Sequence, residues 1–306
     1  MKLRHPFLYL VLASGLIAGA LLVFTSDRED PGIASSVLAR DRVAIIDVVG
    51  VITSSHDVSQ GTSSSRHIIE QLEKYGENDS VKAIVLRIDS PGGTVVAAQE
   101  IYAALNRLRR ETGKTVVVSM ADVAASGGYY IACAADRIFA NPGTITGSIG
   151  VIMQFPNLEG LFGKIGIRTI TIKSGEFKDT GNALREMTER ETRLLQDLID
   201  DVFSQFVDAV EKGREMEGEE VRALADGRIF TGRQAKGFGL IDELGDFEEA
   251  VNMAAELSGI EGKPVILQEK KKRRFWDLLE SRLSGIIPRP AGGFAVAGGR
   301  LFYLWK

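Results

Sequence analysis

Three short runs of β-branched and other apolar residues most constrain how this chain can fold. They lie at 43–52, 83–88 and 115–120. Such runs are typical of strands that are buried on both faces of a parallel sheet. Between them, apolar residues recur at helical spacing at 67–75 and 95–108. The alternation of strand and helix predicts an α/β core whose strands are largely parallel.

Length and composition allow one substantial domain with appended ends. The chain has 306 residues, 44% of them hydrophobic, and a net charge of -4 that is too small to indicate a nucleic-acid partner. Its single cysteine, Cys133, excludes an intrachain disulfide and lies in an apolar run, where we expect a buried structural thiol. Its three histidines, His5, His56 and His67, leave few options for a histidine-dependent hydrolase.

The N-terminal segment has the composition of a membrane anchor. Residues 7–24 are almost entirely apolar, close to the minimum length for crossing a bilayer, with basic residues before them and acidic residues after them. A cleaved signal peptide is the alternative, but the apolar run continues beyond the small residues at 18–20. We therefore predict a transmembrane signal anchor at 1–25 and a linker at 26–41, with the rest of the chain outside the cytoplasm.

Two further segments complete the predicted body, a catalytic domain at 42–262. A β-branched stretch at 168–172 predicts another strand, and Thr188 with Glu191 forms a capping box that begins a long packing helix. The tail at 263–306 carries a basic run and then aromatic residues at amphipathic spacing. This pattern suits a membrane surface or a solvated tail equally well.

Three glycine-containing loops follow predicted strands. The loop at 89–93 presents backbone N–H groups of the kind an oxyanion site requires, although Gly-Gly after proline is also common in tight turns. Ser126 has small neighbours and precedes a helical run, where it is either a nucleophile or a helix cap. The third loop, at 147–150, contains Ser148 and is also compatible with a simple turn.

Lys178 is the candidate general base. It lies in a polar loop at 173–179, and it can accept a proton only if burial or nearby positive charge lowers its pKa toward neutrality. The alternative is an ordinary solvated lysine. Backbone N–H groups of Gly92 and Gly127 are the candidate donors to an oxyanion that forms at Ser126.

Together, the loops at 89–93, 125–130, 146–151 and 174–179 resemble those of the signal peptide peptidase A family, peptidase family S49, in its short single-copy form. The resemblance extends over about 42–260. It implies a Clp protease/crotonase-like fold, which is a spiral of β-β-α units, and peptide-bond hydrolysis by a Ser-Lys dyad without metal or cofactor.

The resemblance also implies roles for individual residues: nucleophile Ser126, base Lys178, lysine-orienting hydroxyl Ser148, and oxyanion donors Gly92 (with Gly93 as an alternative) and Gly127. Short-form relatives assemble as rings in which one subunit's serine meets a neighbour's lysine. The expected partners are therefore peptides such as remnant signal peptides, the lipid bilayer and further copies of the chain. The expected location is a bacterial cytoplasmic membrane, with the N-terminus inside and the catalytic domain on the extracytoplasmic side.

Three alternatives compete with this interpretation. A Ser-His-Asp triad would need His56 or His67, which lie in polar segments typical of the surface. A crotonase-like acyl-CoA enzyme would share the first loop, but export separates the domain from CoA, and such hydratases place carboxylates where this chain has Ser126 and Lys178. An inactive membrane scaffold that binds peptides would need neither of these two side chains.

Overall fold

The computed structural model describes residues 41–54, 62–269 and 302–304. The chain divides into two compact units, 1–40 and 41–306. The predicted anchor at 1–25 and all but the last residue of the linker lie outside the described residues. Among the helices that are described, none combines the length and the apolar character needed to cross a bilayer.

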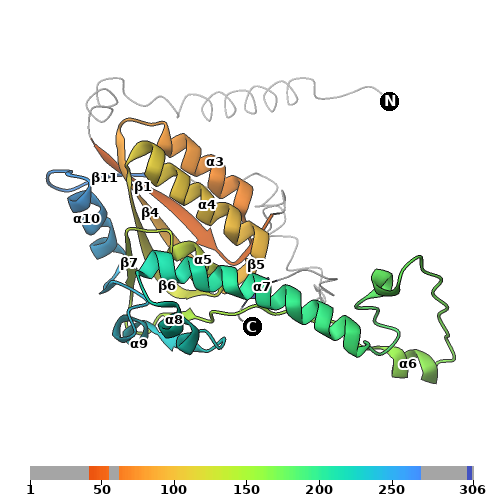
Figure 1. Ribbon diagram of the computed structural model, residues 1–306. Coiled ribbons are helices and arrows are strands. Elements are labelled where there is room, and N and C mark those ends of the chain that lie inside the picture. Colours follow the sequence, from red (N-terminus) through yellow and green to blue (C-terminus); the bar gives the residue numbers. More distant parts are fainter. Residues whose placement is uncertain (1–40, 55–61, 270–301, 305–306) are drawn as a thin grey trace, which may run out of the picture. The chain divides into compact units, whose positions relative to one another are not determined.

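A largely parallel sheet forms the centre of the body, and its main path runs in the order β10-β7-β6-β4-β1-β11 (Figure 1). Strand β4 pairs in parallel with β1 on one side and with β6 on the other. Their apolar residues are buried on both faces, as the continuous runs predicted. The strands of this path are β1 (Arg42–Val49), β4 (Val81–Ser90), β6 (Thr115–Ala125), β7 (Arg137–Ala140), β10 (Glu243–Leu244) and β11 (Val265–Gln268).

The three predicted strands are confirmed, with differences at their ends. Gly50, at φ 71°, interrupts the first run and separates β1 from β2 (Val51–Thr53). The third strand continues to Ala125 and therefore ends directly before Ser126. Strand β11 pairs with β1 although it lies beyond the domain boundary predicted at residue 262, so the sheet extends past that boundary.

A second, smaller sheet has the order β12-β5-β2-β3. Its strand β5 (Gly92–Thr94) follows β4 after Pro91, and it lies between β2 and the antiparallel β12 (Phe302–Leu304). The remaining strand is β3 (Thr62–Ser64). A Cβ atom at Gly93 would lie 1.9 Å from the carbonyl oxygen of Ile52, so only glycine permits this approach of the two backbones.

Helices cover both faces of the main sheet (Figure 1). Helices α3 (Ser65–Gly76) and α4 (Val95–Thr112) confirm the predictions at 67–75 and 95–108 and pack on one face. Helix α10 (Phe247–Leu257) packs on the other face, against β1, β4 and β6. The shorter elements α5 (Gly127–Ala132), β8 (Ile145–Gly147), α8 (Gly218–Leu224), β9 (Ile229–Thr231) and α9 (Gly232–Gly237) lie near the carboxyl ends of the strands.

Helix α7 (Glu189–Arg214) begins with the predicted capping box, which is confirmed: the Glu191 N–H donates to Thr188 Oγ1 over 3.2 Å. Only its C-terminal half packs in the core, where Phe206 is fully buried. In its N-terminal half Leu198 is 47% exposed. The prediction of a packing helix therefore holds for half of α7.

An arm of residues 153–188 extends beyond the N-terminus of α7 and contains α6 (Glu159–Lys164) and the 3-10 helix η1 (Glu176–Asp179) (Figure 1). The strand predicted at 168–172 is wrong, because no strand is present in this segment. Ile170 and Ile172 are 88% and 97% exposed. The β-branched residues here mark an exposed apolar surface and not a buried strand.

The backbone at the end of α5 packs directly against the backbone of the last turns of α7, with no side chain between them. Cys133 is buried, as predicted, and burial raises the pKa of its thiol to about 12. A Cβ atom at Gly213 would lie 2.0 Å from the Cys133 carbonyl oxygen. Glycine at position 213 is therefore a packing requirement of this helix contact.

We expect Gly213→Ala to destabilise the fold by about 1–3 kcal/mol, because the added methyl group must separate two backbones. Alanine is the better helix former, so without this contact the substitution would be stabilising. Gly160→Ala in α6 is the matched control, since its Cβ would meet nothing within 4 Å. Urea unfolding of both variants measures the difference, and equal midpoints would contradict the packing argument.

Candidate active site

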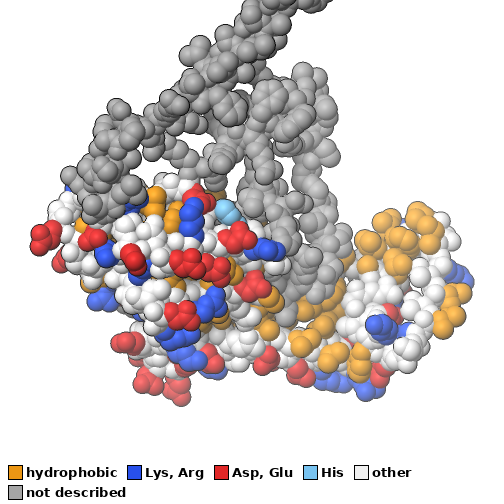
Figure 2. Space-filling model, turned by 90° about the horizontal axis from the view of Figure 1, so that it is seen from above, with side chains coloured by type: hydrophobic (Ala, Val, Ile, Leu, Met, Phe, Trp, Pro, Cys, Tyr) orange, Lys and Arg blue, Asp and Glu red, His pale blue; other side chains and the backbone are white. Residues whose placement is uncertain are grey.

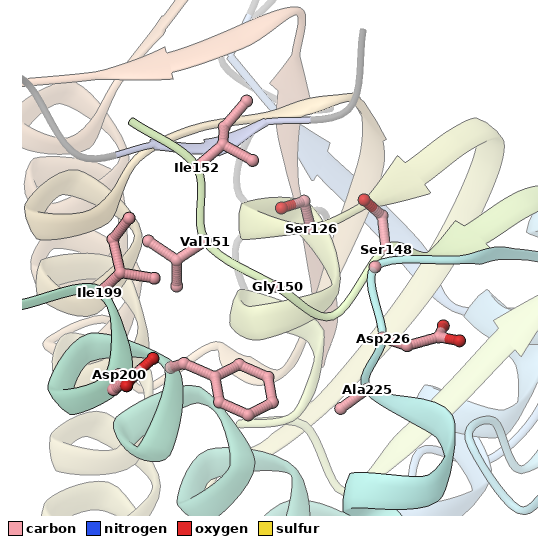
Figure 3. A pocket seen from close by; sticks show the side chains of 11 residues that line it. Ser126, Ser148, Gly150, Val151, Ile152, Ile199, Asp200, Ala225 and Asp226 are labelled. Carbon is pink, nitrogen blue, oxygen red and sulfur yellow. The ribbon is translucent and has the colours of Figure 1, made fainter. Parts of the chain in front are cut away.

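Ser126 and Ser148 are neighbours because of the parallel register between β6 and β8. Ala125 pairs with Gly147, so each serine is the next residue after a paired position. Paired strands lie about 5 Å apart. The Ser126 N–H donates to the Gly147 carbonyl oxygen over 2.8 Å, which fixes the separation of the two segments. Figure 3 shows the two side chains next to each other at one pocket.

Both serines have left-handed backbone conformations. Ser126 has φ 53° and ψ -114°, and Ser148 has φ 50°. Positive φ is uncommon for a residue with a side chain and costs about 1–3 kcal/mol, so it persists only where the surroundings enforce it. Ser126 forms the sharp turn between β6 and α5, yet its hydroxyl makes no capping hydrogen bond to the helix. Ser126 therefore occupies the N-cap position of α5, but its hydroxyl does not cap the helix.

The loop that carries Gly92 lies against the same turn. Ser90 pairs with Ala124, and a Cβ atom at Gly128 would lie 3.2 Å from the Ser90 carbonyl oxygen. The Gly92 N–H donates to Ser90 Oγ over 3.1 Å and is thus already engaged within its loop. Gly127 is the first residue of α5, so its N–H has no acceptor inside the helix. Of the two candidate oxyanion donors, Gly127 is the one that its own element leaves unused.

A pocket of about 390 Å³ opens beside the serines (Figure 3). Ile199 and Phe203 of α7 supply part of its apolar wall, and Asp200 and Asp226 are its acidic members. Hydrogen bonds from Arg228 lower the pKa of Asp226 to about 2, so this carboxylate is ionised at neutral pH. The other lining residues are Ser126, Ser148, Gly150, Val151, Ile152, Ala225 and Gly227.

Lys178 is not among the residues that line this pocket. It is exposed in η1, and η1 is attached to the start of α7: Arg190 bonds Glu176 over 2.8 Å and lies over the Phe177 ring. The pocket contacts α7 at Ile199, which is nine residues or about 14 Å along the helix from Arg190. One chain therefore brings Ser126, Ser148, Gly127 and the Gly92 loop together, but not Lys178.

A charged cluster that no sequence pattern predicted lies beside Lys178. Arg185 donates to both carboxylate oxygens of Asp179, over 2.9 and 3.0 Å, and to Glu191 over 2.8 Å. Lys173 bonds Asp179 over 2.6 Å. Hydrogen bonds from Arg185 lower the pKa of Glu191 to about 2 and hold that of Asp179 well below its usual range. Only the capping box could be found by spacing, because Asp179 ends the short helix η1 and Arg185 lies on the irregular loop that follows it.

The family model described as "Peptidase family S49" matches residues 108–261. A protein of Synechocystis named "Putative protease" is 45% identical over 228 residues, which cover 74% of this chain and 78% of that protein. The chain belongs to peptidase family S49. A "Putative signal peptide peptidase SppA" of Enterococcus faecium is 35% identical, over 69% of this chain and 62% of that protein. A "Serine protease SPPA, chloroplastic" of Arabidopsis thaliana is 35% identical, over 72% and 33%.

The resemblance found in the sequence is thus confirmed, and this S49 peptidase is a serine peptidase of the signal peptide peptidase A type. Its α/β architecture with a parallel sheet agrees with that family. His67 is exposed on α3 and contacts Gln71, while His56 lies outside the described residues. Within 41–54 and 62–269, no three His, Cys, Asp or Glu side chains are grouped so that they could hold a metal ion.

We expect Glu191→Gln to lower the stability of the S49 peptidase at neutral pH. The folded-state pKa of Glu191 is depressed from 4.5 to about 2, so its ionised form stabilises the fold above about pH 4.5, and this contribution is lost as the pH falls toward 2. The difference in urea midpoint between parent and variant should therefore narrow over that range.

Glutamine keeps the capping box, so this comparison isolates the charge. Glu189→Gln, in the same turn but with a side chain that is 92% exposed, is the control and should show little difference at any pH. If the urea midpoints of the parent and Glu191→Gln differ as much at acid pH as at neutral pH, the stabilising role of the ion pair is contradicted.

Proposed function

We propose that this chain is a membrane-anchored serine endopeptidase in which Ser126 attacks the peptide carbonyl and Lys178 is the general base. The observation that carries the proposal is the strained turn at Ser126, which presents a non-capping hydroxyl to a pocket beside Ser148. A strained strand-to-helix turn is the usual way to expose a nucleophile above a sheet.

The reaction follows from these positions. The neutral amine of Lys178 takes the Ser126 proton as the hydroxyl oxygen bonds to the scissile carbonyl carbon. The Gly127 N–H, with an N–H of the loop at 89–93, holds the oxyanion. Lys178 then returns the proton to the leaving amine, and the acyl group remains on Ser126. The Lys178 amine then activates the water that hydrolyses this ester, and the Ser148 hydroxyl orients the Lys178 amine throughout.

The lysine comes from a neighbouring copy in this proposal. Lys178 is carried away from its own Ser126 by the arm, whose apolar side chains are exposed (Figure 2). A monomer rarely exposes so many large apolar residues together, and a second copy would cover them. A head-to-tail arrangement of copies closes into a ring and gives every serine a lysine. The exposed residues are Leu158, Leu161, Ile165, Ile167, Ile170, Ile172 and Phe177.

Extended peptide segments are the proposed substrates. The antiparallel pairing of β12 with β5, in which Tyr303 lies opposite Gly93, supports this, because it occurs beside the oxyanion loop. A substrate that adds a strand at such an edge is held by its backbone and needs little sequence preference. Remnant signal peptides fit this requirement, and the name of the Enterococcus faecium relative points the same way.

The proposed location follows from the N-terminal segment. A retained anchor at 1–25 would hold the enzyme at a bacterial cytoplasmic membrane, with the catalytic body on the extracytoplasmic side.

The two sheets, joined where β1 passes into β2 and β4 passes into β5, are compatible with the spiral of β-β-α units of Clp protease-like enzymes. A crotonase-like acyl-CoA enzyme and an inactive peptide-binding scaffold are the competing functions.

We expect Ser126→Ala and Lys178→Ala each to lower kcat/KM by several orders of magnitude, because the two groups act as a unit. A fluorogenic peptide assay on the full chain measures this. Ser204→Ala is the serine control, because the Ser204 hydroxyl donates to the Asp201 carbonyl oxygen within α7 and does not line the pocket. Activity of the parent should rise into the alkaline range as the amine loses its proton. Undiminished hydrolysis by either variant would refute the dyad.

We expect the two inactive variants to complement each other when they are mixed and reassembled. A site shared between copies can combine the serine of one variant with the lysine of the other, and roughly a quarter of the sites in a random ring would do so. Activity of the mixture, measured with the same peptide, should therefore exceed that of either variant alone. No recovery would place both dyad members in one chain.

A further inference from the structure

The other three side chains of η1, those of Glu176, Phe177 and Asp179, each contact an arginine or lysine side chain. Arg190 bonds the Glu176 carboxylate and covers the Phe177 ring, and Arg185 binds Asp179. Lys173 bonds both the Asp179 carboxylate and the Glu176 carbonyl oxygen, over 2.6 and 2.7 Å. The Lys178 amine itself makes no hydrogen bond or ion pair with any residue that the structure describes.

Arg185 is the centre of this cluster. Its guanidinium donates to the Asp179 carboxylate, to the Asp179 carbonyl oxygen over 3.2 Å, to the Glu186 carbonyl oxygen over 2.9 Å and to both oxygens of Glu191. Glu191 is 1% exposed and belongs to the capping box of α7. A planar guanidinium with five N–H groups can contact these six acceptor atoms at once if one N–H is shared, whereas a lysine ammonium with three cannot.

These contacts have two consequences for the neighbouring amine. They attach η1 to the first turn of α7, which is the helix whose later turns line the Ser126 pocket. They also occupy Asp179, the acid adjacent to Lys178 in sequence. A carboxylate free to approach the amine would stabilise its protonated form, and a protonated amine cannot accept a proton from serine.

We propose that Arg185 is a positioning residue for the peptidase reaction, holding the Lys178 turn on α7 and keeping the Asp179 carboxylate away from the Lys178 amine. The inference rests on the proposed function, since it assigns Arg185 a role through the base of that site. The charged side chains of the cluster beside Lys178 are Lys173, Glu176 and Asp179 on its own segment, Arg185 on the next, and Arg190 and Glu191 on α7. Glu186 and Glu189 are the other charged residues between positions 173 and 191.

The test compares Arg185→Ala with the double variant Arg185→Ala/Asp179→Asn in the full chain. Arg185→Ala should lower kcat more than it changes KM, and it should move the alkaline rise of the pH profile to higher pH. A rise of one unit in the amine pKa leaves about tenfold less neutral amine at neutral pH. The double variant should return the rise to its parental pH but not restore kcat, because the turn is still detached from α7.

Arg109→Ala is the matched control for lost stability. Arg109 forms a comparable, partly exposed ion pair with Asp136, on a different part of the surface. This variant should lose thermal stability without moving the pH profile. If the alkaline rise stays at higher pH in the double variant, the Asp179 carboxylate is not the cause and the proposal is overturned. If the pH profile of Arg185→Ala matches that of the parent, the proposal is overturned as well.

A second measurement separates this inference from the proposed function. Trace acetylation with acetic anhydride over a range of pH, read by mass spectrometry on the peptide that contains Lys178, reports the titration of the amine directly. The pH at which Lys178 becomes acetylated should rise in Arg185→Ala and return to the parental value in the double variant, even if Ser126 is not required for hydrolysis. If Lys178 is acetylated with the same pH dependence in Arg185→Ala as in the parent, the proposed role of Arg185 is overturned, whatever the peptidase assay shows.

Discussion

The parallel register of β4, β6 and β8 is the constraint on which the site depends. Ser90 pairs with Ala124 and Ala125 pairs with Gly147, so the three loops that follow these strands leave the sheet side by side. The left-handed turn at Ser126 is tolerated because the strands before it and α5 after it are buried and hydrogen-bonded. Core packing therefore offsets local strain and places a hydroxyl at the pocket.

Helix α7 connects the two parts of the proposed mechanism. Its C-terminal half is core, its middle lines the pocket, and its first turn carries the charged cluster that holds η1. The same helix therefore contributes to the wall of the Ser126 pocket and holds the segment that carries Lys178. In the proposed shared site, a complete dyad would depend on contacts between copies, and the exposed apolar residues of the arm are the surface proposed for those contacts.

The sequence predicted the elements of the core well, because buried strands and amphipathic helices have distinct periodicities. Its resemblance to a family also nominated Ser126, Ser148, Lys178 and the two glycines as site residues, and these assignments remain predictions. It could not show that Ser126 and Ser148 are adjacent, since strand register is a tertiary property. The false strand at 168–172 has the same origin: exposed and buried β-branched residues look alike in sequence. The role of Arg185 depends on an irregular loop, for which no spacing rule exists.

Because Cys133 is buried, its reactivity can report the separation of α5 from α7. It is the chain's single cysteine, it is buried where α5 meets α7, and its thiol is protonated at ordinary pH. Reagents that attack thiolates can reach it only when that helix contact separates. The rate of modification of the natural sequence would thus record how often the helix behind the nucleophile detaches from the one that leads to the arm, without any engineered label.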